Sequence, residues 1–170
     1  MIRFIAPFIL YILFISESIF AKLAGEWFYL SHIYSPEFIL IALIFLAFYG
    51  PKNYYLGYAI FFGALTDIVY SEVIGIYLLA YPVVCYFVNL MRTTVQNNYI
   101  IALIISLVGV ALVESFSYLI NLVIRITTLP MQVFIVNRLL PTLLFNFIFL
   151  VVAMFFLRKM AEKIKGIIEK

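Results

Sequence analysis

Three acidic residues interrupt long apolar runs of this sequence: Glu17, Asp67 and Glu114. A carboxyl group in such a run can bind a cation, pass a proton or pair with a base, and in lipid it is costly unless it faces protein or water. Each acid comes about 13 to 15 residues into its expected helix, or roughly 20 Å at the α-helical rise. We therefore expect the three acids at one depth, in a shared polar layer.

Small residues recur every four positions around Asp67. Ala59, Gly63 and Ser71 share its expected helix face, and such a stripe lets the backbone of a neighbouring helix come close. The stretch predicts a tightly packed pair of helices with the aspartate at their contact.

A second polar face accompanies Glu114. Helical spacing places Asn121 and Arg125 on this face, and we expect Arg125 to help neutralise the layer from its outer end. The last expected helix adds further residues of this kind: Arg138, Pro141 and Asn146. Two interpretations stay open: the acids hold helices together, or they line an outward-opening pocket or a docking groove.

Enzyme chemistry finds no support in the motifs. The sequence contains neither G-x-S-x-G nor H-E-x-x-H, and its single histidine, His32, lies in an expected loop. These facts exclude a His-dependent serine triad and a multi-histidine metal site. The single cysteine, Cys85, excludes an internal disulfide and a cysteine metal site. We expect no cofactor and no catalysis, since no flanking motif supports a dyad of Asp67 and Glu114.

The elements that position these residues are transmembrane helices. The chain has 170 residues, of which 67% are hydrophobic and 11% charged, and its mean hydropathy is +1.19. About 20 apolar residues cross a bilayer, and the continuous Leu, Ile and Phe runs favour helices over a β-barrel. We predict an all-α integral membrane protein with a single transmembrane domain, 1–170. Its expected spans are 3–22, 37–50, 54–71, 73–91, 99–122 and 139–157.

The basic residues predict the orientation. With the amino terminus in the cytoplasm, eight of the eleven Lys and Arg residues fall on the inner side, as the positive-inside rule requires. Both termini are then cytoplasmic. Residues 1–25 could also form a signal peptide, but Glu17 and the length of the run favour an uncleaved first helix. The second span is short and must either extend into residues 31–37 or lie where the bilayer is thinned.

The end of the chain, 158–170, is basic and amphipathic. Met160 and Ile164 share one helical face, from which Lys159 and Lys163 point away. The pattern is typical of a helix on an anionic membrane surface, of a docking helix, or of a solvated basic end.

The stretch 53–92 resembles the MreD family of rod shape-determining proteins. The positions that carry the likeness are Gly57, Gly63, Asp67 and Gly75, followed by the basic end of the next helix at Arg92. The acid Glu114 in the fifth span and a closing helix with Pro141 and a basic tail agree with the family, so the likeness covers essentially the whole chain.

This resemblance implies a non-catalytic scaffold of the cell-elongation complex in the bacterial inner membrane. Such proteins bind MreC and help connect MreB filaments to the peptidoglycan synthases RodA and penicillin-binding protein 2; no nucleic acid is implied. The expected packing or docking residues are Gly57, Gly63, Asp67, Ser71, Gly75, Glu114, Asn121 and Pro141. The expected contacts with membrane lipid or the filament are Arg92, Arg158, Lys159, Lys163 and Lys165.

A similar six-helix bundle occurs in the S components of energy-coupling-factor transporters. A substrate-binding subunit of that kind is the alternative function. Those proteins present small residues on their first helix, whereas residues 3–20 here are bulky. The expected polar layer of Glu17, Asp67 and Glu114 would then bind a small cationic or hydrogen-bonding ligand.

Overall fold

Six helical rods make up the part of the chain that the computed structural model describes. The described residues are 5–27, 34–52, 54–71, 73–94 and 98–168, with side chains described for 6–22 and from residue 34 onward. The rods are α1 (Ile5–Trp27), α2 (Phe38–Tyr49), α3 (Tyr54–Tyr70), α4 (Ile76–Met91), α5 (Tyr99–Val123) and a continuous segment of α6 (Met131–Phe134), η2 (Ile135–Leu139) and α7 (Leu140–Ile168). The all-helical class is confirmed, and no strand occurs among these residues.

Helix α2 lies at the centre of the bundle. All twelve of its residues are buried, and its neighbours are α1, α3, α4, α5 and α7. At 1.5 Å per residue it is about 18 Å long, which is shorter than the hydrocarbon layer. Its surroundings are protein on every side, so its length is matched to the bundle rather than to lipid.

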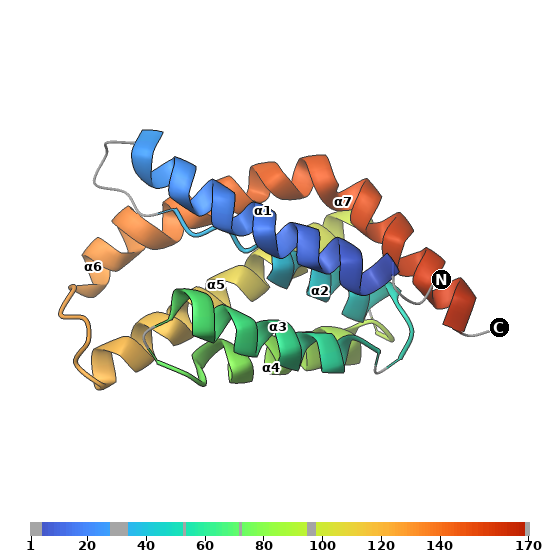
Figure 1. Ribbon diagram of the computed structural model, residues 1–170, viewed down its shortest axis with the longest axis horizontal. Helices are drawn as coiled ribbons and strands as arrows, with labels where there is room; N and C mark the ends of the chain where they lie inside the picture. The colour runs from blue at the N-terminus through green and yellow to red at the C-terminus, as the bar shows by residue number, and fades with distance from the viewer. Residues whose placement is uncertain (1–4, 28–33, 53, 72, 95–97, 169–170) are drawn as a thin grey trace.

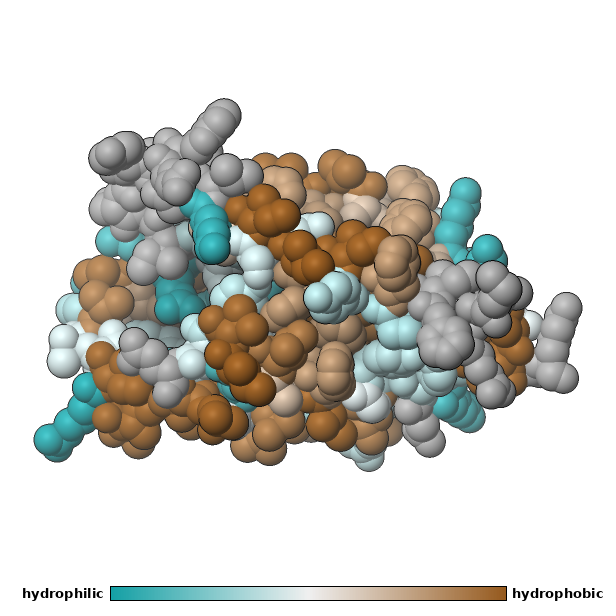
Figure 2. Space-filling view, viewed as in Figure 1, coloured by the Kyte–Doolittle hydropathy of each residue, from teal (hydrophilic) through white to brown (hydrophobic). Residues whose placement is uncertain are grey.

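The outer surface is apolar around the middle. Hydrophobic side chains cover much of the middle of the visible face, and the strongly hydrophilic ones gather towards its two ends (Figure 2). Two helical segments among the described residues are long and apolar enough to cross a membrane, Tyr99–Val123 and Met131–Ile168. Helix α1 begins, and α7 ends, at the same end of the molecule (Figure 1).

Three helices differ from the expected spans by three or more residues at an end, and the first of them, α1, runs on to Trp27. Residues 73–75 belong to a turn, because Gly75 has a φ of 119° and Ser71 Oγ bonds to both the N–H and the carbonyl of Val73. The last helix begins at Met131 and runs on to Ile168. The helix includes most of the expected tail, 158–170, because the apolar face of the tail, including Met160 and Ile164, is buried in the core.

Candidate functional site

Asp67 caps the start of the neighbouring helix. The residue is completely buried on α3. Its Oδ2 accepts hydrogen bonds from the N–H groups of Gly75 and Leu78, both at 2.9 Å. Its Oδ1 accepts one from Tyr77 N–H at 2.9 Å. The first N–H groups of a helix have no partner within it, and its positive end favours an acid. Asp67 therefore fastens the first turn of α4 to α3.

The glycines of α3 differ in their surroundings. A Cβ atom at Gly63 would lie 2.5 Å from the carbonyl oxygen of Tyr77, so the α3 and α4 backbones touch there. A Cβ at Gly57 would meet no atom within 4 Å among the described residues. Gly75 allows the left-handed turn between the helices. Close packing of α3 on α4 thus depends on Gly63 and not on Gly57.

Glu17 caps α2 in the same way. Its carboxyl group is buried, and Oε2 accepts a hydrogen bond from Ile39 N–H at 3.1 Å. From the other side, Asn146 Oδ1 accepts from Glu37 N–H at 2.9 Å, and its Nδ2 donates to the Ser35 carbonyl. Residues of α1 and α7 thus satisfy the first turn of α2. Each of the helices α2 and α4 is capped by an acid of the helix before it: Glu17 of α1 caps α2, and Asp67 of α3 caps α4.

Arg92 closes the opposite end of α2. Its Nη1 donates to the carbonyl oxygen of Gly50 at 3.0 Å and to that of Ala47 at 3.4 Å. The last carbonyls of a helix lack partners and its negative end favours a cation. Side chains of other helices therefore satisfy backbone groups at both ends of the buried helix.

Two further acids lie near the start of α2 and on α5. Glu37 Oε2 accepts a hydrogen bond from the Tyr81 hydroxyl at 2.9 Å. Glu114, fully buried, pairs through Oε2 with Arg138 Nε at 2.9 Å. Glu37 is within electrostatic range of Glu17, Glu114 and Arg138. We call Glu17, Glu37, Glu114 and Arg138 the acidic layer. It holds three carboxyl groups and one guanidinium, and Glu114 Oε1 has no partner among the described residues.

A wide helical turn carries Arg138. Residues of η2 form a π-helix, in which Leu140 N–H donates to the carbonyl of Ile135, five positions earlier. Pro141 follows and has no N–H to donate, which interrupts the regular pattern of the helix. Single π turns often occur at functional positions. Here the turn carries the basic partner of Glu114.

The predicted role of Arg125 is wrong. Helix α5 ends at Val123, and Arg125 lies in the following turn with a φ of 64° and an exposed side chain. Helical spacing therefore does not extend from Glu114 to this residue. Asn121, also on the expected face, donates within its own helix to the Ser117 carbonyl at 2.8 Å.

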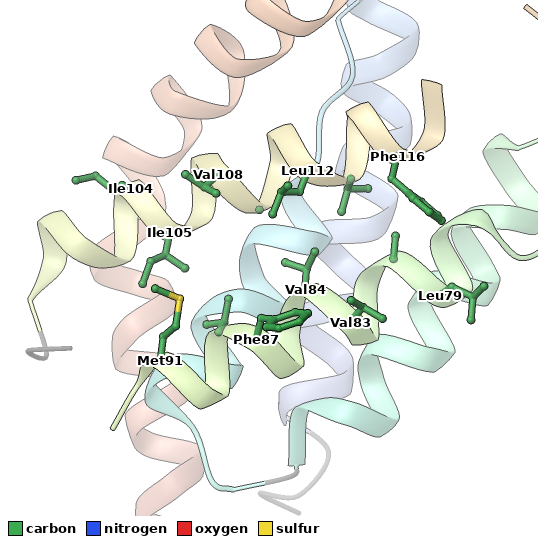
Figure 3. Close-up of a pocket in the computed structure, with 14 residues that line it drawn as sticks. Leu79, Val83, Val84, Phe87, Met91, Ile104, Ile105, Val108, Leu112 and Phe116 are labelled. Atoms are coloured by element: carbon green, nitrogen blue, oxygen red, sulfur yellow. The ribbon is translucent and has the colours of Figure 1, made fainter. Parts of the chain in front are cut away.

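An apolar cleft separates the outer faces of α4 and α5. It encloses about 500 Å³, and its lining consists entirely of apolar side chains and Gly109. Figure 3 shows Val83 and Phe87 of α4 on one side and Val108 and Leu112 of α5 on the other. From Leu79 to Met91 the cleft follows α4 over about 18 Å.

A family description, rod shape-determining protein MreD, matches residues 2–164. The chain belongs to the MreD family. It is 27% identical over 145 residues to the rod shape-determining protein MreD of Bacillus subtilis (strain 168), which covers 85% of this chain and 84% of the relative. It is also 27% identical over 139 residues to the cell shape-determining protein MreD of Streptococcus pneumoniae (strain ATCC BAA-255 / R6), covering 82% and 84%. No solved structure matches. The resemblance to the MreD family is thereby confirmed, and with it a role in determining cell shape.

In this MreD-family chain, the five basic residues expected to contact lipid or the filament fall into two groups. Arg92 bonds to α2, and Arg158 pairs with Glu162 at 2.7 Å and lies over the rings of Tyr49 and Tyr99. Both arginines therefore make contacts within the bundle that stabilise it. The others are Lys159 and Lys163, which are exposed, and Lys165, which is partly exposed.

Sequence reasoning missed two residues of the site. Glu37 directly follows Pro36 and reads as the polar first residue of a helix, yet it is 3% exposed. Gly109 lies where a Cβ would be 2.6 Å from Ile44 of α2. Glu37 could have been found from its place directly before a wholly apolar run. A helix that is apolar on all sides is surrounded by protein or lipid, so its first residue is buried as well.

Proposed function

We propose that this chain is a non-catalytic scaffold of the cell-elongation complex, which binds MreC and helps connect MreB filaments to RodA and penicillin-binding protein 2. Membership of the MreD family supports this proposal most directly. The polar contacts support it as well. Asp67, Glu17 and Arg92 bind the ends of helices, which stabilises a rigid bundle.

The proposal includes a membrane arrangement. The chain crosses the inner membrane six times, with both ends in the cytoplasm. Three observations support it: the apolar middle of the surface, the two long apolar helices, and the start of α1 at the same end as the end of α7. The basic residues at that end, including Arg92 and Arg158, agree with a cytoplasmic side.

The cleft between α4 and α5 is the proposed docking site for the single membrane helix of MreC. A transmembrane helix presents an apolar surface, and interfaces between such helices favour small residues that allow close approach. The cleft offers a lining without polar side chains, a small residue at Ala80, and a length of several helical turns. The shape and chemistry of the cleft thus suit a helix lying along it.

Site-specific photocrosslinking in native membranes tests the proposal. A photoreactive residue at Phe87 or Val108, both exposed in the cleft, should crosslink to MreC. The control position is Val152 of α7, which is 78% exposed and lies outside the cleft. Crosslinking to MreC from Val152 alone, or to lipid alone from the cleft, would reject the docking site. Failure to recover MreC from any position would reject the scaffold proposal itself.

A further inference from the structure

A separate cavity lies between the first turns of α1 and the last part of α7. It encloses about 270 Å³ and is lined by Ile9 of α1 and by Phe156, Met160 and Ile164 of α7. Met160 and Ile164 are 6% exposed and form the inner wall, whereas Phe156 is 57% exposed. The cavity therefore offers an apolar interior that reaches the outer surface of the bundle.

Ile167 and two lysines complete the lining. Lys159 and Lys163 stand four residues apart on α7, about 6 Å along the helix. Both are exposed, and neither has an ion-pair partner among the described residues. The nearby cation Arg158, in contrast, is engaged by Glu162 and two tyrosine rings. The cavity thus combines two free positive charges with an apolar interior.

The position of the cavity along α7 matches the boundary of a bilayer. The segment from Leu140 to Leu157 contains no charged residue, and charges begin at Arg158. Lysines at such a boundary direct their amino groups to the headgroup region while their stems contact apolar surface. An amphiphile with an anionic head and a hydrocarbon tail would meet both halves of this site.

We propose that this cavity binds an anionic phospholipid, with its phosphate between Lys159 and Lys163 and an acyl chain against Ile9 and Phe156. The inference rests on the proposed membrane arrangement but not on the binding of MreC. It assigns to the end of α7 a lipid site in place of a freely solvated tail.

The test is native mass spectrometry of the full chain, purified in detergent and titrated with phosphatidylglycerol or phosphatidylcholine. The Lys159→Gln/Lys163→Gln variant should retain roughly ten- to thirtyfold less phosphatidylglycerol, since each lysine near an anionic surface contributes about a fivefold change. Retention of phosphatidylcholine should not change. The matched control is Lys52→Gln/Lys165→Gln, which removes the same charge from residues outside the cavity lining and should stay within about twofold of the parent.

The cavity is tested apart from the charge. Ile9→Trp fills it with both lysines intact and should weaken retention of phosphatidylglycerol. Because this variant could disturb folding, the parent chain is also compared with long-chain and short-chain phosphatidylglycerol, and we expect it to prefer the long chain. Equal losses from the two lysine pairs, or equal retention of the two chain lengths, would overturn the lipid site. Either result would leave the docking of MreC to be judged by crosslinking.

Discussion

Asp67 Oδ1 lies 2.9 Å from the backbone nitrogen of Tyr77, and the carbonyl of the same tyrosine faces Gly63, one helical turn before Asp67 on α3. The carboxylate accepts three N–H groups of the first turn of α4, and both of its oxygens are used. An aspartate within an apolar run is thus explained by the unpaired donors that it satisfies.

Asp67→Asn is expected to destabilise the protein. The amide nitrogen of asparagine is a donor, so one backbone N–H of α4 would face a donor instead of an oxygen. The expected cost is about 1–3 kcal/mol, as for a buried group left unsatisfied. The midpoint of thermal unfolding in detergent measures the loss. Ser71→Ala, in the turn that follows, is the control and should have a smaller effect. An unchanged midpoint for Asp67→Asn would contradict the capping role.

Gly63→Ala and Gly57→Ala form a matched pair on one helix. At Gly63 the added methyl group meets the Tyr77 carbonyl at 2.5 Å, so α3 and α4 must separate. We expect a cost of about 1–3 kcal/mol, which is typical of overpacking. At Gly57 the methyl group enters open space, and we expect no loss. Thermal unfolding of the two variants compares them directly. Equal midpoints would mean that the glycines pack alike.

The Glu114–Arg138 pair predicts a non-additive double mutant. Arg138→Gln leaves a buried carboxylate without its charged partner and should cost about 3–5 kcal/mol. The Glu114→Gln/Arg138→Gln double variant should recover part of that loss, because neither charge remains. Arg125→Gln serves as the control, since Arg125 is exposed in a turn, and should leave stability unchanged. Additive single effects in a double-mutant cycle would show that the pair is not coupled.

Arg92 should contribute more to the free energy of unfolding than Lys52, a basic residue at the same end of the bundle. Arg92→Gln loses the charged donor at the end of α2 and is expected to cost about 1–2 kcal/mol. Lys52→Gln removes an equal charge from an exposed side chain and should cost little. Limited proteolysis between α2 and α3 would report local opening as well as global unfolding. If both variants behave alike, the effect of Arg92 is its charge and not its bonds to α2.

The helical class follows from the apolar runs, because only a helix satisfies all the backbone N–H and C=O groups of a continuous apolar run of this length within the run itself. The central place of α2 does not follow from them. The expected span 37–50 reads as a short helix that extends into residues 31–37 or lies where the bilayer is thinned. Only the packing of five neighbouring helices buries every residue of α2.

For the site, the sequence indicates the buried acids but not the residues that they contact. Asp67 and Glu114 stand out by composition, but their partners depend on turns. Gly75 turns α4 back onto Asp67, and the π turn before Pro141 carries Arg138, whereas the expected partner Arg125 lies beyond the end of its helix. Gly57 and Gly63 look alike in sequence, yet only Gly63 faces another backbone.

The contacts at the start of α2 also determine how late in synthesis the centre of the bundle can be completed. Ser35 and Glu37 bond to Thr142 and Asn146, which follow them by 107 and 109 positions. When the ribosome has made the first four helices, these two backbone groups still await partners in residues not yet translated. A nascent chain that stops before residue 142 therefore carries an incomplete centre.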